Sequence, residues 1–106
     1  MSQQYKVLIS GEAKQMLSEH VYFLAQVDPK AAEDCKREII NGIRSLEKMP
    51  ERFPLFEPEN RLSPYRKMFI SKRYLVLYII KEDTVYIEYI LDCRQDYGYS
   101  MFSCSP

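Results

Sequence analysis

The strongest pattern of apolar positions in the chain runs from Tyr65 to Arg94. It consists of three runs rich in β-branched and aromatic residues, separated by short polar breaks at residues 71–73 and 81–84. Runs of this composition, bounded by polar turns, are typical of strands that follow one another in an antiparallel meander. The second break has the length and polarity of a tight hairpin loop. The sequence therefore predicts three antiparallel strands in its C-terminal half.

Alternation within the last of these strands separates a more apolar face from a more polar one. The apolar set is Val85, Ile87, Tyr89 and Leu91, and the other set is Tyr86, Glu88, Ile90, Asp92 and Arg94. If the strand is regular, Arg94 projects with the solvent-facing set. The preceding strand is apolar on both faces, which favours a central position in the sheet.

The N-terminal half predicts a short strand followed by two amphipathic helices. Residues 5–9 alternate as in a strand, and Ser10 suits the N-cap of a helix whose apolar stripe runs to Val27. Asp28 and Pro29 suit the N-cap and first position of a second helix. The stripe of this second helix is Ala32, Cys35, Ile39, Ile43 and Leu46. Because the connection is short, the two helices should form an antiparallel hairpin.

Two features qualify this pattern. Gly42 lies in the middle of the second helix, where it should cost about 1 kcal/mol relative to alanine. We expect close packing to compensate, with the first helix as its partner.

Residues 50–64 contain four prolines, which argue against a regular element. The aromatic residues between them predict an ordered, packed connection to the sheet.

Together these elements predict a single α+β domain spanning residues 1–106. Its order is an N-terminal strand, an α-helical hairpin and an antiparallel three-stranded meander, or β-α-α-β-β-β. The first strand should pair at an edge or beside the last strand. The helices should cover one face of a twisted sheet, and the other face should be partly open and concave.

Composition narrows the functional classes. No apolar run approaches the roughly 20 residues that cross a bilayer, and the N-terminus has no apolar signal segment. We therefore expect a cytoplasmic protein with no membrane partner. The three cysteines are odd in number and show no paired close spacing, which argues against a disulfide framework or a zinc site. We expect neither a metal nor a cofactor.

Charge is balanced overall but uneven along the chain. Residues 1–60 carry 8 basic and 10 acidic residues, and residues 61–106 carry 7 and 5. The meander half is thus mildly basic, which is weak evidence for an anionic partner. A dedicated nucleic-acid-binding domain is normally much more basic.

Several short features, in order and spacing, resemble the RelE/ParE superfamily of toxins from type II toxin–antitoxin modules, which includes proteins like those of plasmid stabilisation systems. The features are Tyr5-Lys6-Val7, Ala13, Ala31-Ala32, the Ile43, Leu46 and Pro50 spacing, Tyr65-Arg66, the run Tyr74–Tyr78, and Arg94. The resemblance covers most of the chain and implies the fold described above. It also implies a toxin that arrests growth and that a cognate antitoxin neutralises by wrapping around it.

The superfamily implies two alternative targets. RelE-like members cleave mRNA on the ribosome without a metal, using basic residues and often a C-terminal Tyr or His. ParE-like members lack this set and act on DNA gyrase. The resemblance carries four candidate catalytic residues, Arg66, Arg73, Arg94 and Tyr97. Arg73 would stand in for an arginine of the ribonucleases where this chain has Leu75, and Met68 replaces a second basic residue.

The chemistry of this set is incomplete. Arginines can stabilise charge that develops on phosphate, but their pKa is too high for a base. A tyrosine would serve only if neighbouring arginines lowered its pKa. His20 lies on the helical stripe, so we expect a structural role. The sequence therefore leaves three readings: an mRNA endoribonuclease, a gyrase-directed toxin, or an orphan domain that only binds protein. In the last case the arginines would make surface salt bridges, such as Arg94 with Asp92 or Glu88.

Overall fold

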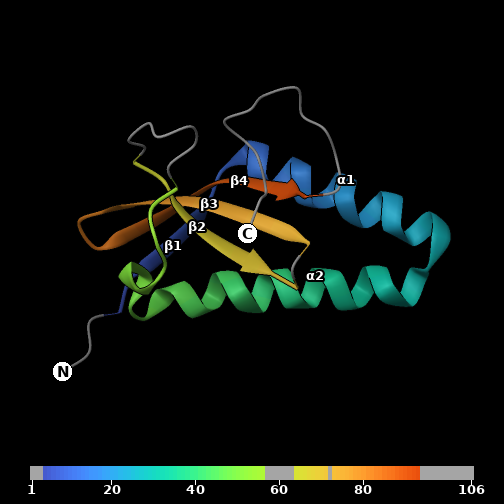
Figure 1. Ribbon diagram of the computed structural model, residues 1–106, viewed down its shortest axis with the longest axis horizontal. Coiled ribbons are helices and arrows are strands. Elements are labelled where there is room, and N and C mark those ends of the chain that lie inside the picture. Colours follow the sequence, from blue (N-terminus) through green and yellow to red (C-terminus); the bar gives the residue numbers. More distant parts are fainter. Residues whose placement is uncertain (1–3, 57–63, 72, 94–106) are drawn as a thin grey trace.

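The computed structural model describes residues 4–56, 64–71 and 73–93 of the chain (Figure 1). The elements in order are β1 (Lys6–Ile9), α1 (Gly11–Val27), α2 (Pro29–Arg44), β2 (Arg66–Ile70), β3 (Tyr74–Lys81) and β4 (Thr84–Asp92). Two short 3₁₀ helices, η1 (Ser45–Glu47) and η2 (Pro50–Arg52), follow α2. The predicted β-α-α-β-β-β order is confirmed. Within the described residues, no helix has the length and apolar character needed to span a bilayer.

The four strands form one mixed sheet in the order β1-β4-β3-β2. β1 runs parallel to β4, while β4 with β3 and β3 with β2 are antiparallel. The meander is therefore confirmed, as is the position of the first strand at an edge beside the last. β1 and β2 are the two edge strands, and β3 lies inside the sheet, as its apolar sequence predicts.

Local capping chemistry begins both helices where the sequence predicts. The Ser10 hydroxyl accepts a hydrogen bond from the Ala13 amide at 3.0 Å, and the Asp28 carboxylate accepts one from the Ala31 amide at 3.1 Å. Each cap satisfies an amide that has no partner inside its own helix. The end of the hairpin projects beyond the sheet (Figure 1). Val27 in this last turn is 84% exposed, so its predicted place on the buried stripe is wrong.

Close packing at Gly42 is present, but its partner is the sheet. A Cβ atom added at Gly42 would lie 2.9 Å from Cδ1 of Ile70 in β2. The expected contact with α1 is therefore wrong, because this side of α2 faces β2.

The proline-rich connection also contains one regular turn, η2, which begins at Pro50. Proline suits the first position of a helical turn, where its missing N–H has no partner to lose.

A β-bulge interrupts the pairing of β3 and β4. Leu77 pairs with Tyr89, and the next residue, Tyr78, pairs with Ile87. Glu88 is therefore an extra residue on β4. An extra residue reverses which face each later side chain occupies.

The bulge overturns the predicted faces of the last strand. Val85 and Ile87 face the helices as one set, but beyond the bulge Ile90 joins them in the helix-side core. Asp92, predicted to face solvent, is only 5% exposed and pairs in register with the buried Tyr74. The prediction was wrong here because alternation was counted through an irregular position.

The sheet has an apolar core on each face. The helix-side core joins the stripe of α2 to the inward residues of the strands. A second cluster on the other face has Phe56, Leu75, Leu77 and Leu91 as its buried members. Since Leu75 and Leu77 are completely buried, the expected open, concave face is not present at these positions.

Candidate functional site

Arg66 begins β2 and holds the proline-rich connection against the sheet. Its Nη1 donates hydrogen bonds to the carbonyl oxygens of Phe53 at 2.7 Å and Glu51 at 3.2 Å. Its register partner Tyr78 adds a third bond, from the buried phenol to the Pro50 carbonyl at 2.7 Å. The guanidinium of Arg66 therefore satisfies the backbone of its own chain.

Arg73 lies in the turn between β2 and β3, beside the end of β4. Its Nη2 is 3.9 Å from the Asp92 carboxylate, and its guanidinium lies 5.2 Å from the centre of the Tyr74 ring. The side chain of Arg73 is 24% exposed and that of Asp92 8%. Both side chains are therefore mostly removed from water, and the Asp92 carboxylate offsets part of the Arg73 charge.

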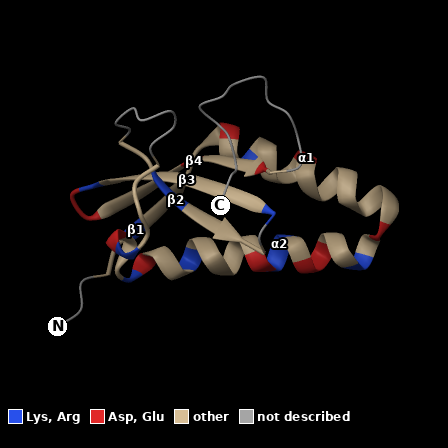
Figure 2. Cartoon of the chain, in the orientation of Figure 1, with Lys and Arg blue, Asp and Glu red and all other residues tan. Residues whose placement is uncertain are grey.

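Arg66 and Arg73, the two candidate catalytic arginines that the structure describes, do not form one site. They lie at opposite ends of β2, and a strand of five residues rises about 17 Å. The other two candidates, Arg94 and Tyr97, lie outside the described residues. Charged residues gather along α2 and at the ends of strands, while the strands are largely uncharged (Figure 2).

Sequence reasoning missed a buried polar cluster around Arg73. His20 is 4% exposed, and its Nε2 lies 2.7 Å from the Ile90 carbonyl. A carbonyl only accepts, so this nitrogen carries the proton. The His20 ring lies 5.6 Å from the ring of Tyr74, which packs against Arg73. The helical stripe predicted that His20 is internal, but the contribution of Asp92 depends on the bulge and left no signal in the sequence.

Three polar atoms of this cluster make no hydrogen bond within the described structure: Nδ1 of His20, Nε of Arg73 and the Tyr74 hydroxyl. Such atoms are uncommon in protein interiors. His20 of α1 and Tyr74 of β3 are nonetheless buried between the helix and the sheet, so the polar atoms of these two residues are not accessible to a substrate. The cluster is therefore a set of buried polar contacts between α1 and the end of the sheet.

The tyrosine pKa shifts in the described residues are all upward, which disfavours a tyrosine as a catalytic base. Burial raises the pKa of Tyr65 and of Tyr74, and it raises the pKa of Tyr78 to about 12. A hydrogen bond to Glu51 raises the pKa of Tyr5. A tyrosine that acts as a base needs the opposite shift. The described residues also contain no group of three or more His, Cys, Asp or Glu suited to holding a metal ion.

Comparison with known proteins finds one matching family model and several solved structures with a similar fold. The family model described as the ParE toxin of the type II toxin–antitoxin system, parDE, matches residues 7–97. The solved structure of the chromosomal ParDE toxin–antitoxin system from P. aeruginosa superimposes with a TM-score of 0.72 at 13% identity, covering 86% of this chain and 98% of that chain. The solution structure of the conserved hypothetical protein HP0894 from Helicobacter pylori gives 0.57 at 15% identity, covering 86% and 97%. At these identities the structures establish the fold alone. No curated protein matches the chain.

Proposed function

This chain belongs to the ParE toxin family of type II toxin–antitoxin systems, and on that basis we propose that it arrests growth and is neutralised by a cognate antitoxin. The match spans residues 7–97, which include every described helix and strand except the first residue of β1. Family membership is the observation that carries the proposal. We place the chain in the cytoplasm, where its candidate targets are found.

We further propose that the target is DNA gyrase and not ribosome-bound mRNA. Metal-free cleavage of RNA needs cations and a proton acceptor grouped at the scissile phosphate. Arg66 bonds to backbone carbonyls, Arg73 lies against Asp92, and the two are separated by the length of β2. His20 is enclosed, and the shifted tyrosine pKa values are raised. These placements support a toxin that acts by binding a protein.

Induced expression separates the two targets. A gyrase-directed toxin should stop growth with loss of plasmid supercoiling and induction of the DNA-damage response, while incorporation of labelled amino acids continues at first. An mRNA endoribonuclease should stop that incorporation within minutes and leave supercoiling intact. The second pattern would overturn the proposed target and leave family membership untouched.

The antitoxin part of the proposal has its own test. Co-expression with the small open reading frame beside this gene should restore growth, and the two products should purify as one complex. An orphan domain that has lost toxicity would give no growth arrest at any expression level. That result would overturn the proposal, provided that the chain accumulates as folded protein.

A further inference from the structure

The outer edge of β1 has backbone groups that pair with no other described residue. The Lys6 amide donates to the Asp83 carbonyl and the Ser10 amide to the Ile87 carbonyl, each at 2.9 Å. In a parallel pair only alternate residues direct their amides and carbonyls toward the partner strand. Val7 and Ile9, which lie between these positions, therefore direct theirs away from the sheet. Exposed groups of this kind are a template for pairing with another strand.

The start of this edge is closed by the chain itself. The Tyr5 amide donates to the Glu47 carbonyl at 2.8 Å, so η1 covers the strand before Lys6. The open part is consequently the short stretch from Val7 to Ile9. Leu8 in its centre is 47% exposed, although it is a large aliphatic residue.

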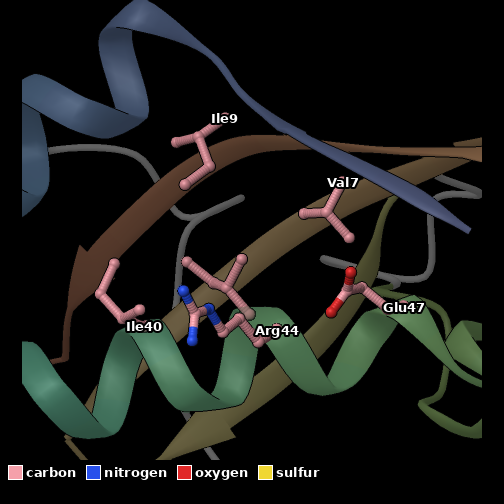
Figure 3. Close-up of a pocket in the computed structure, with 6 residues that line it drawn as sticks. Val7, Ile9, Ile40, Arg44 and Glu47 are labelled. Atoms are coloured by element: carbon pink, nitrogen blue, oxygen red, sulfur yellow. The ribbon is translucent and has the colours of Figure 1, made fainter.

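A groove of about 250 Å³ lies between this edge and the last turns of α2 (Figure 3). Its apolar lining is Val7, Ile9, Ile40 and Ile43, and its charged residues are Arg44 and Glu47. Figure 3 shows the Arg44 guanidinium on the Ile40 side of the groove and the Glu47 carboxylate on the Val7 side. The groove is therefore positive toward one end and negative toward the other.

The two charges do not neutralise each other within the chain. No ion pair joins Arg44 to Glu47, and no residue in the described part of the structure pairs with Arg44. The Glu47 carboxylate has only a long bond, 3.4 Å, from the exposed Gln4 amide. Both charges are thus available to a partner that lies along the groove.

We propose that a second copy of this chain pairs with the β1 edge, antiparallel and about a two-fold axis at Leu8. In this register Val7 of each copy faces Ile9 of the other as a hydrogen-bonded pair, which uses the outward amides and carbonyls of both. Leu8 then faces Leu8 of the second copy in the non-hydrogen-bonded position, where Cα atoms approach to about 4.5 Å. The result is one continuous sheet through two molecules.

The charge pattern selects a second copy as the occupant. A two-fold axis turns one molecule end for end, so Arg44 of each copy faces Glu47 of the other. Such an isologous interface requires a patch that is complementary to itself, and one charge of each sign at opposite ends of the groove meets that requirement. The formal net charge of the chain is zero at pH 7, so no overall repulsion opposes association. The inference concerns the free chain and does not depend on which cellular target it has.

Charge reversal tests the arrangement. Sedimentation of the full chain over a range of concentrations should show a monomer–dimer equilibrium. Arg44→Glu or Glu47→Arg alone should raise the dissociation constant about tenfold or more, since like charges then face each other. The double variant Arg44→Glu/Glu47→Arg should restore it, because the swap preserves self-complementarity. Val27→Lys, at the far end of the hairpin, is the control for a surface charge and should change nothing.

Cross-linking tests the register independently of stability. Leu8→Cys should form a disulfide-linked dimer under mild oxidation, because the two Cβ atoms would adjoin at the axis. Lys6→Cys lies on the same face two residues away, far from its own symmetry mate, and should not. The unsubstituted chain, with its own three cysteines, gives the background.

Four results would overturn the proposal. One is a chain that is monomeric at every concentration. Another is a double charge variant as weak as its single parents, or equal cross-linking at positions 6 and 8. The last is a monomeric chain in which Arg44→Glu abolishes binding of the antitoxin, since the groove would then belong to that protein.

Discussion

Tyr78 and Arg66 show how single side chains tie the proline-rich connection to the sheet. Both lie at one end of the β2–β3 pair, and together they satisfy the carbonyls of Glu51, Phe53 and Pro50. The backbone of this connection is irregular, so side chains of the sheet donate to these carbonyls. These bonds give both residues a structural purpose that needs no substrate.

Tyr78→Phe should lower the free energy of unfolding by about 1–3 kcal/mol, because the buried Pro50 carbonyl loses its donor. Urea denaturation at neutral pH measures this. Tyr86→Phe on the neighbouring strand is the matched control. Its side chain is 37% exposed, and the change should stay within about 0.5 kcal/mol. Equal effects of the two substitutions would contradict the assigned bond.

The same residue predicts an alkaline dependence of stability. Burial raises the pKa of Tyr78 to about 12, above the ordinary value of 10. Below pH 10 both the folded and the unfolded chain keep this proton, so its stabilising contribution is complete. Between pH 10 and 12 the unfolded chain releases the proton first, so stability falls as pH rises. The stability difference between the native chain and Tyr78→Phe should therefore shrink from pH 9 to 11. A constant difference would show that the pKa of Tyr78 is not raised.

Arg66 offers a test of the predicted catalytic role. If its bonds to the connection are its purpose, Arg66→Ala should destabilise the chain by about 1–3 kcal/mol. Growth arrest should then persist at temperatures where the variant is folded. Lys67→Ala controls for the loss of a positive charge on the same strand. A folded Arg66→Ala protein without toxicity, beside a toxic Lys67→Ala protein, would assign Arg66 to the functional site.

At the scale of elements, local sequence signals determine which helices and strands form, and tertiary packing determines their register and contacts. The strand–helix–helix–meander order follows from periodicity and from caps such as Ser10 and Asp28, whose chemistry is local. The bulge at Glu88 has no such signal, because the register of β4 is set by its neighbours. One extra residue there reversed the predicted surroundings of Asp92. The sequence likewise showed that Gly42 needs a close neighbour but not which element supplies it.

The contact of α2 with β2 predicts coupling between Gly42 and Ile70. Gly42→Ala gains about 1 kcal/mol of helix propensity, but its new methyl group meets Cδ1 of Ile70. Ile70→Val removes that atom. Gly42→Ala should therefore be more favourable in the Ile70→Val background than in the native chain, by about 0.5–1 kcal/mol in a double-mutant cycle. Asn41→Ala, one residue away and exposed, should show no coupling to Ile70→Val. Additive effects at both positions would contradict the close approach.

At the scale of the molecule, the fold was more predictable than the site. Topology follows from patterns spread over many residues, so errors at single positions, such as Val27, leave it intact. A site depends on which side chains converge, and pairs such as Arg73 with Asp92 are set by register and burial. The resemblance to ribonucleases therefore gave candidate catalytic residues. In the structure two of them, Arg66 and Arg73, interact with groups of their own chain.

The most direct measurement is a supercoiling assay with purified components. The chain, freed from its antitoxin, is added to DNA gyrase, relaxed plasmid and ATP, and in parallel to programmed ribosomes. If the chain acts on gyrase, supercoiling is inhibited in proportion to the toxin added, adding back the antitoxin restores it, and ribosome-bound mRNA stays intact. Unchanged supercoiling together with cleaved mRNA would contradict the proposed target.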